Sequence, residues 1–436
     1  MDASGHFSGK RVTVMGLGLL GRGVGDARYL AECGADLIVT DLKPREALAE
    51  SVAALERFPN MRFVLGEHRL EDFRDRDFIL KAAGVPLDSP FIAEAEKNNI
   101  PVRMSADLFA EISRVPVIGI TGTRGKSTVT HLVAAILEEA GWPVLLGGNI
   151  RGVSTLALLP LATSSHTAVL ELDSWQLQGW RAAGMSPHIA VFTTFYPDHL
   201  NYYAEDIGAY LADKSNIFLR QTPEDTLVLG AQCAPLIIEK YGERIESRII
   251  VADETKLPDT WALRTIGTHN RYNAALALAA ARSYGIADEA SRRAIESFPG
   301  VPGRLEFIRE MGGVNVYNDT ASTTPEATLA ALAALDPSRI VLIMGGADKG
   351  LRMDALLAQL ASVKKVILLE GTGTSRIREA LPHAPVYDSL PDAVEDSRSS
   401  ATRGDSILFS PAFASFGMFK NEYDRGDRFT AIIRAL

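Results

Sequence analysis

The stretch Gly122–Thr128, with the sequence G-T-R-G-K-S-T, combines glycines, a lysine and hydroxyl side chains at the spacing of a phosphate-binding loop. The apolar, β-branched run Val115–Ile120 before it predicts a buried strand, and the residues after it predict a helix. At such a turn backbone N–H groups face an anion, Lys126 contacts phosphates and the hydroxyl of Ser127 can hold Mg²⁺. Ile120 stands where the full pattern has its first glycine, so this is a shorter variant. We interpret it as a nucleotide-binding loop rather than a glycine turn with a surface lysine.

Two further polar residues follow predicted strands downstream of this loop. Glu171 lies near the carboxyl end of a predicted strand over Thr167–Leu172, and His199 lies in the loop after a predicted strand over His188–Thr194. Open parallel sheets bind ligands at the carboxyl ends of their strands. A carboxylate there, after a phosphate loop, is expected to bind Mg²⁺, with a salt-bridged strand end as the alternative. For His199, a metal or phosphate role and an ordinary solvated loop remain equally open.

Lys214 occupies an unusual position in a predicted helix within Asp206–Arg220. The apolar residues that share its face are Ile207, Tyr210, Leu211, Ile217 and Phe218. Desolvation on such a face would lower the pKa of the amine and leave it neutral and nucleophilic. A neutral amine can take up CO₂, and the resulting carbamate offers oxygen ligands to Mg²⁺. The alternative is a lysine that extends its charged end to water.

The beginning of the chain carries a second glycine pattern. A predicted strand over Arg11–Met15 leads into G-L-G-L-L-G at Gly16–Gly21, and a second strand over Leu37–Thr40 ends at Asp41. This arrangement is typical of a dinucleotide-binding βαβ unit, and by itself it predicts NAD. The pyrophosphate of any other nucleotide would suit the same turn. The pattern therefore leaves two interpretations, an NAD-dependent oxidoreductase and a protein that binds another nucleotide here.

The later polar stretches are less specific. In Gly267–Asn273, which precedes an alanine-rich helix, Asn270 and Asn273 could bind a nucleobase or ribose, or simply cap the helix. A Pro/Gly hinge at Gly300–Gly303 opens a third region. Its predicted strands are 314–317, 340–344, 366–369 and 406–409, each followed by polar residues.

The periodicities together predict an α/β fold with three domains. The expected domains are residues 1–107, Rossmann-like; residues 108–299, like a phosphate-loop ATPase; and residues 300–436, again Rossmann-like. With a net charge of −9 and a pI near 5.5, nucleic acid and anionic membranes are not expected as partners. Two distant cysteines, a polar first ten residues and the lack of any apolar run of about 18 residues predict a soluble cytoplasmic protein.

Taken in order, these motifs resemble one family over essentially the whole chain. The motifs are T-G-T-R-G-K-S-T, E-L-D-S-W-Q, D-H-L-N-Y-Y, the helical Lys214, G-T-H-N-R-Y-N, P-G-R-L-E, N-D-T and S-P-A-F-A-S-F. The set is similar to the Mur ligases of peptidoglycan synthesis, and within them to the branch that adds glutamate. Folylpolyglutamate synthases share the later motifs but lack the first domain.

The resemblance implies an ATP-dependent ligation. The carboxylate of UDP-N-acetylmuramoyl-L-alanine attacks the γ-phosphate to give an acyl phosphate, and the amine of D-glutamate then displaces phosphate. Catalytic roles are implied for Lys126, Glu171, His199 and Lys214. Two Mg²⁺ ions are implied, one held by Ser127 and Glu171 and one by His199 and carbamylated Lys214. A monomer that acts on small molecules only is expected.

The resemblance also implies three sets of binding residues. ATP contacts are implied for Gly122, Thr123, Arg124, Gly125, Lys126, Ser127, Thr128, Asn270, Asn273, Arg304 and Asp319. Contacts to the uridine-nucleotide substrate are implied for Gly18, Leu19, Leu20, Asp41, Asn149 and Gln176. Contacts to glutamate are implied for Thr323, Lys349 and Ser415.

The chain departs from the family pattern mainly at the incoming amino acid. Ala321 stands where the family has a lysine, and Glu422 precedes Tyr423 where the family has its aromatic residue. In the first domain, Ala82–Gly84 replaces the usual S-P-G. One cation fewer for the carboxylates of glutamate leaves the L-glutamate enzyme as an alternative, and a non-catalytic NTP-binding relative as another.

Overall fold

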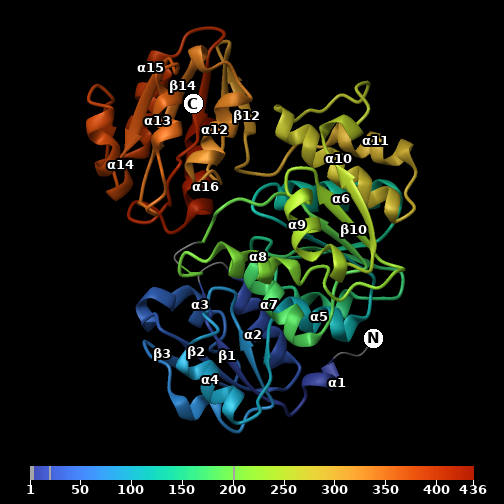
Figure 1. Ribbon diagram of the computed structural model, residues 1–436. Helices are drawn as coiled ribbons and strands as arrows, with labels where there is room; N and C mark the ends of the chain where they lie inside the picture. The colour runs from blue at the N-terminus through green and yellow to red at the C-terminus, as the bar shows by residue number, and fades with distance from the viewer. Residues whose placement is uncertain (1–3, 19–20, 200–201) are drawn as a thin grey trace. The chain divides into compact units, whose positions relative to one another are not determined.

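The computed structural model describes residues 4–18, 21–199 and 202–436 (Figure 1). Within these residues the strands form three sheets. The chain divides into two compact units, Met1–Trp261 with Tyr272–Ile295, and Ala262–Arg271 with Glu296–Leu436. The first unit contains two of the sheets and the second unit contains the third. This α/β architecture agrees with the sequence prediction.

The first sheet has the strand order β3-β2-β1-β4-β5, and all its strands are parallel. The strands are β1 (Arg11–Met15), β2 (Asp36–Asp41), β3 (Met61–Leu65), β4 (Phe78–Lys81) and β5 (Val102–Arg103). The accompanying helices are α1 (Ser4–Phe7), α2 (Arg22–Glu32), α3 (Ala49–Ala53) and α4 (Pro90–Lys97). The chain order reverses between β1 and β4, so Met15 and Lys81 flank the crevice where such sheets bind ligands.

The central sheet has the order β11-β10-β9-β6-β8-β7 and is also parallel throughout. Its strands are β6 (Val117–Thr121), β7 (Val144–Gly148), β8 (Thr167–Glu171), β9 (Ile189–Phe192), β10 (Thr226–Gly230) and β11 (Arg248–Ala252). Its helices are α5 (Ser105–Ser113), α6 (Lys126–Glu139), α7 (Ser174–Ala183), α8 (Ile207–Ser215), α9 (Ala234–Tyr241), α10 (Thr268–Ser283) and α11 (Asp288–Ser297). Because β6 lies between β8 and β9, the loops after these three strands meet at one edge.

The first two sheets share one apolar core. A single cluster of buried side chains extends from Leu37 in β2 through Phe109 in α5 to Trp180 in α7. Phe109 and Leu37 are fully buried and Trp180 is 1% exposed. This continuity explains why residues on both sides of the predicted boundary at 107 belong to one compact unit.

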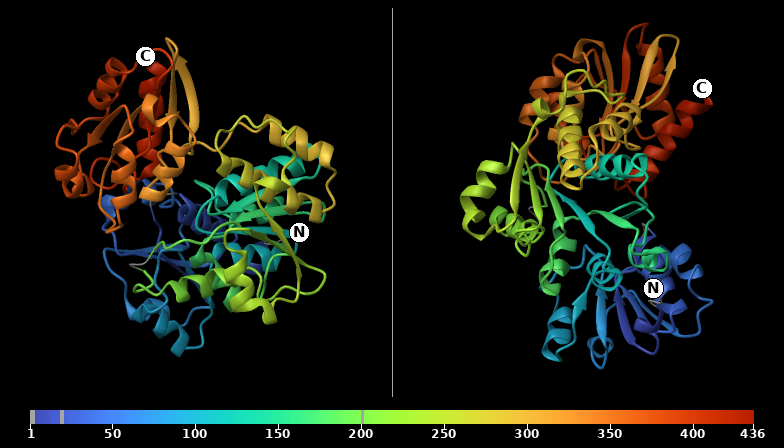
Figure 2. Two further views of the ribbon diagram at one scale, coloured as in Figure 1. Left: turned by 45° about the horizontal axis from the view of Figure 1, so that its top comes forward. Right: turned by 90° about the vertical axis from the view of Figure 1, so that its right-hand side faces the viewer.

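The third sheet has the order β12-β13-β17-β14-β15-β16. Its strands are β12 (Glu306–Met311), β13 (Val314–Asn318), β14 (Ile340–Gly345), β15 (Lys365–Leu369), β16 (Val386–Tyr387) and β17 (Ser406–Phe409). Its helices are α12 (Pro325–Ala333), α13 (Asp354–Leu360), α14 (Thr372–Ile377), α15 (Leu390–Ser400) and α16 (Glu422–Ala435), and Figure 2 shows helices on both faces of the sheet. Only β12 runs antiparallel to its neighbour, and the sequence had not predicted it. No helix among the described residues is both long and apolar enough to cross a membrane.

Candidate active site

The predicted phosphate loop connects β6 to α6, and its glycines are required by close approaches. Gly122 and Gly125 have φ angles of 137° and 86°. A Cβ on Gly122 would lie 2.0 Å from Thr193 Oγ1, and one on Gly125 would lie 2.4 Å from Asn273 Oδ1. Since α6 begins at Lys126, the N–H groups of its first turn border this loop. The cradle therefore fits the phosphates of a nucleotide.

The loop is fixed by hydrogen bonds to the segment after β9. Thr123 N donates to Thr194 O at 2.7 Å, and Arg124 N donates to Thr194 Oγ1 at 2.9 Å. The Arg124 guanidinium lies 3.2 Å from the carboxylate of Asp198. Lys126 Nζ donates to Thr123 O at 3.2 Å, so its charge lies over the loop. The structure thus brings together the loop residues that the sequence singled out.

Glu171 ends β8, directly beside β6, and is 2% exposed. Its Oε1 accepts a hydrogen bond from Asn149 Nδ2 at 3.1 Å. Its Oε2 is buried and has no hydrogen-bond partner among the described residues. A buried carboxylate oxygen without a donor is costly unless a cation binds it. The arrangement fits a Mg²⁺ ligand.

Lys214 lies in α8 and is only 1% exposed, as the helical pattern predicted. Its Nζ donates to Gly122 O at 2.9 Å and lies 4.8 Å from the centre of the Tyr210 ring. Burial lowers the pKa of Lys214 well below its usual value, and the charge of Lys126 lowers it further. One part of the predicted face is different, since Ile207 is 40% exposed. The buried amine fits the chemistry of carbamate formation, because only a neutral amine reacts with CO₂.

His199 lies on the same edge, in the loop after β9, and has a φ of 54°. Its ring packs 4.6 Å from the ring of Trp175. Burial lowers the pKa of His199, and the neighbouring Asp198 only partly opposes this effect. The imidazole is therefore neutral near pH 7, which is the form that binds metals.

The predicted metal ligands are of mixed types. The part of the chain that the structure describes contains no cluster of three or more His, Cys, Asp and Glu side chains able to hold a metal ion. The predicted set has only Glu171 and His199 of these types, and it depends on Ser127 and a carbamate on Lys214 for the rest. The set stays a prediction.

The residues predicted to bind the uridine nucleotide behave in different ways. Asp41 Oδ2 accepts from Leu17 N at 2.9 Å and from Gly18 N at 3.1 Å, so this carboxylate holds the glycine turn in place. Gln176 forms a capping box with Asp173 at the start of α7, which gives it a structural role as well. Leu19 and Leu20 lie outside the described residues.

The two asparagines of α10 belong to different units. Asn273, in the first unit, lies against Gly125 and is 6% exposed. Asn270, in the second unit, donates from Nδ2 to Ile266 O at 2.8 Å. Only Asn273 is therefore placed at the phosphate loop by contacts within one unit.

The polar residues of the second unit follow the adjacent parallel strands β13, β17 and β14. Asp319 Oδ1 accepts from Leu305 N at 2.9 Å and its Oδ2 accepts from Ser410 Oγ at 2.7 Å. Lys349 Nζ donates to Thr323 Oγ1 at 3.0 Å. Arg304 immediately precedes Leu305, and Ser415, in the loop after β17, is 4% exposed. Polar residues predicted from separate motifs therefore meet at one edge of this sheet.

Three family models match the chain. They are described as the Mur ligase MurD-like N-terminal domain, over residues 10–104; the Mur ligase middle domain, over residues 120–262; and the Mur ligase glutamate ligase domain, over residues 303–413. The chain belongs to the Mur ligase family. This confirms the predicted three-domain α/β fold and an ATP-dependent acid–amino-acid ligase, and it decides against the NAD-dependent alternative.

Similar proteins include other Mur ligases at full length. UDP-N-acetylmuramoylalanine–D-glutamate ligase from Roseiflexus sp. (strain RS-1) is 40% identical over 467 residues, covering 99% of each chain. The protein of the same name from Borreliella burgdorferi (strain ZS7) is 34% identical, covering 97% of each. Among solved structures, UDP-N-acetylmuramate–alanine ligase from Thermotoga maritima has a TM-score of 0.62 at 19% identity and covers 98% of this chain and 99% of its own. Folylpolyglutamate synthase from Mycobacterium tuberculosis has a TM-score of 0.57 at 17% identity and covers 75% of this chain and 93% of its own. At these identities the two structures show a shared fold alone.

One buried cation of this Mur ligase was missed by the sequence analysis. Arg425 in α16 is completely buried and donates to Thr320 O at 2.8 Å and to Phe413 O at 3.1 Å. Burial lowers its pKa to about 10. The signal was present, because Arg425 shares a four-residue spacing with the fully buried Phe429 and Ile433. Through these hydrogen bonds Arg425 links the segment next to Ala321 to the loop that carries Ser415.

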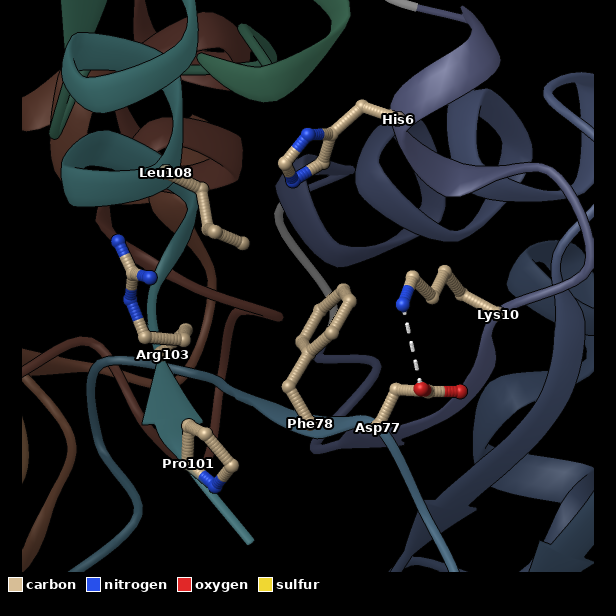
Figure 3. A pocket seen from close by; sticks show the side chains of 7 residues that line it. All are labelled: His6, Lys10, Asp77, Phe78, Pro101, Arg103 and Leu108. Carbon is tan, nitrogen blue, oxygen red and sulfur yellow. Dashed lines mark hydrogen bonds and ion pairs between the residues drawn. The ribbon is translucent and has the colours of Figure 1, made fainter.

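A pocket of the Mur ligase away from these residues is shown in Figure 3. Lys10, Asp77 and Pro101, which line it, immediately precede β1, β4 and β5, so it lies at the amino ends of the strands. Its cations are already paired with carboxylates, Lys10 with Asp77 and Arg103 with Asp107. This pocket is therefore separate from the edge where the predicted site residues gather.

Proposed function

We propose that this Mur ligase joins D-glutamate to UDP-N-acetylmuramoyl-L-alanine with conversion of ATP to ADP and phosphate. Full-length relatives at 40% and 34% identity carry the name of that activity, which supports the choice of substrates. The observation that carries the chemistry concerns two buried groups at one phosphate loop. Burial lowers the pKa of the Lys214 amine, which donates to Gly122 O, and Glu171 Oε2 has no hydrogen-bond partner among the described residues.

The residues of the chain would divide the work as follows. The N–H groups of residues 122–128 and the amine of Lys126 bind and orient the ATP phosphates. Glu171 and Ser127 would hold one Mg²⁺, and His199 with carbamylated Lys214 would hold a second. Bound there, Mg²⁺ would neutralise the phosphates and the attacking carboxylate, which otherwise repel each other. The Lys214 amine would add CO₂ and release one proton to become the carbamate.

The reaction itself consists of two displacements. A carboxylate oxygen of the substrate forms a bond to the γ-phosphorus while the bond from that phosphorus to the β-bridging oxygen breaks, which releases ADP. The amine of glutamate, after losing a proton, forms a bond to the acyl carbon, and the acyl C–O bond breaks to release phosphate. Asp319, Asn270, Asn273 and Arg304 would contact ATP, and Thr323, Lys349 and Ser415 would hold glutamate.

The remaining assignments belong to the same proposal. The domains would be residues 1–107 for the uridine-nucleotide substrate, 108–299 for ATP and 300–436 for the amino acid. The first domain would use Gly18, Leu19, Leu20 and Asp41, with Asn149 and Gln176 on the muramoyl part. We further propose a monomer in the cytoplasm.

The test is phosphate release with ATP, Mg²⁺, bicarbonate and UDP-N-acetylmuramoyl-L-alanine, adding D-glutamate or L-glutamate in turn. Release with D-glutamate alone is expected. Release with L-glutamate alone would mean that Ala321, in place of a lysine, has inverted the choice of isomer. Release with neither amino acid, in an enzyme that still binds both nucleotides, would point to a non-catalytic relative and contradict the proposal.

A further inference from the structure

We propose that Arg22 is a positioning residue that fixes the side-chain amide of Asn149, so that Glu171 keeps one carboxylate oxygen free for a cation. The inference rests on the proposed function, because it takes Glu171 as a metal ligand. It adds a residue of the first sheet to the machinery of the central sheet.

The three side chains form a continuous chain of hydrogen bonds. The Arg22 guanidinium donates from Nη1 to Asn149 Oδ1, across 127 positions of sequence. Asn149 Nδ2 donates to Glu171 Oε1 at 3.1 Å, and Asn149 N donates to Glu171 O at 2.7 Å. The first bond links α2 to the loop after β7, and the others link that loop to the end of β8.

The chemistry of the two ends decides how the amide between them is oriented. A guanidinium can only donate hydrogen bonds and an ionised carboxylate can only accept them, whereas an amide does both. With Arg22 on its oxygen, Asn149 must present its NH₂ group to Glu171. That donor occupies Oε1 and leaves Oε2, which is buried and unpartnered among the described residues, as the oxygen for a cation.

The helix that carries Arg22 is itself fixed against α5 and the segment that follows β7. Asp26 Oδ1, one turn further along α2, accepts from Ser154 Oγ at 2.5 Å and from Ser105 Oγ at 2.8 Å. A Cβ on Gly25 would lie 2.5 Å from Ser154 Cβ, so the helix backbone is in direct contact there. This docking holds Arg22 at the loop that contains Asn149, so its placement does not depend on a flexible side chain alone.

The test is the affinity of Mn²⁺, used in place of Mg²⁺, for the full-length enzyme saturated with a non-hydrolysable ATP analogue, measured by the electron paramagnetic resonance of free Mn²⁺. Because residues that orient metal ligands affect affinity about 10- to 100-fold, Arg22→Met is expected to weaken Mn²⁺ binding by at least about tenfold. Arg22→Lys, which keeps a donor, should lose less. Arg28→Met, further along α2, is the matched control and should bind Mn²⁺ like the wild type.

A double-variant cycle separates this role from direct contact with substrate. In an Asn149→Ala background, Arg22→Met should cause no further loss of Mn²⁺ affinity, because its effect passes through Asn149. A full additional loss would overturn the inference, as would normal Mn²⁺ affinity in Arg22→Met with weakened binding of the uridine-nucleotide substrate. Normal Mn²⁺ affinity in Glu171→Gln would show that Glu171 is not a metal ligand and would overturn both proposals. Weakened Mn²⁺ affinity in Glu171→Gln together with normal Mn²⁺ affinity in Arg22→Met would overturn only the role of Arg22.

Discussion

Replacing Asp319 with asparagine should stabilise the second unit at neutral pH while removing activity. Asp319 is 5% exposed, and burial raises its pKa from 3.8 to about 6, although hydrogen bonds from Ser322, Ser410 and Leu305 and the charge of Arg304 oppose the rise. Asparagine keeps an oxygen for Leu305 N. Its NH₂ group can donate to Ser410 Oγ, because that hydroxyl can donate its own hydrogen to a second acceptor, Thr328 Oγ1, which lies 2.9 Å from Ser410 Oγ.

The magnitude follows from linkage between protonation and folding. A carboxyl whose pKa is raised in the folded state stabilises the protein below pH 3.8, and this contribution is lost as the pH rises to about 6. Because each pH unit is worth about 1.4 kcal/mol, the ionised Asp319 costs about 3 kcal/mol above pH 6. Asparagine cannot ionise, so the free energy of unfolding of the variant, relative to that of the wild type, should rise by about 3 kcal/mol between low and neutral pH.

The assay is the free energy of unfolding of the unliganded full-length protein by urea, measured at several pH values by far-ultraviolet circular dichroism. Tryptophan fluorescence would report on the first unit only, because Trp142, Trp175, Trp180 and Trp261 all belong to it. Asp354→Asn, at an exposed position that begins α13, is the control and should show no such pH-dependent gain. The reasoning would be refuted if the difference in free energy of unfolding between Asp319→Asn and the wild type did not change with pH, or fell as the pH rises.

Three other outcomes are expected. Lys214→Ala should lower kcat about 100-fold or more, because it removes a proposed ligand of the metal that stabilises charge in the transition state; a short carboxylic acid should restore part of the activity, and an unaffected enzyme would contradict the carbamate. Gly125→Ala, with φ at 86° and a Cβ 2.4 Å from Asn273 Oδ1, should weaken binding of an ATP analogue at least about tenfold in calorimetry, with UDP binding unchanged as the control. Asp41→Ala should instead weaken binding of the uridine-nucleotide substrate and leave binding of the ATP analogue unchanged, because it leaves the N–H of Gly18 without its acceptor at a cost of about 1–3 kcal/mol. Normal affinity for the uridine-nucleotide substrate would argue against the role of Asp41 in holding the glycine turn.

Much of the geometry of the candidate site could be predicted because parallel strands end at one edge. Glu171, His199 and the phosphate loop follow three neighbouring strands, so their proximity required only the strand positions and the rule that ligands bind at carboxyl ends. The burial of Lys214 could be predicted because its charged side chain lies on an otherwise apolar helical face. The same kind of pattern is present in α16, where Arg425 shares a four-residue spacing with Phe429 and Ile433.

Other features depend on contacts that no local pattern contains. The bond between Arg22 and Asn149 joins residues that are far apart in sequence, and neither belongs to a motif that names the other. The strand β12 was missed because Glu306–Met311 mixes charged and apolar residues without clear alternation, and its burial pattern is equally mixed. Gln176 was predicted as a substrate contact from its motif. Its capping bonds with Asp173 were missed, although the three-residue spacing of Asp173 and Gln176 is typical of a capping box.

The shared core of the first two sheets bears on how such a chain can be divided. Asp107, the last residue of the first predicted domain, is completely buried and accepts a hydrogen bond from Met104 N at 2.7 Å. A Cβ on Gly179 in α7 would lie 2.5 Å from Asp107 Oδ1. A fragment cut at this position would expose both the carboxylate and the apolar side chains around it to water. The first two domains match separate family models but share one apolar core, so exchanging one of them alone between relatives is expected to disrupt that core.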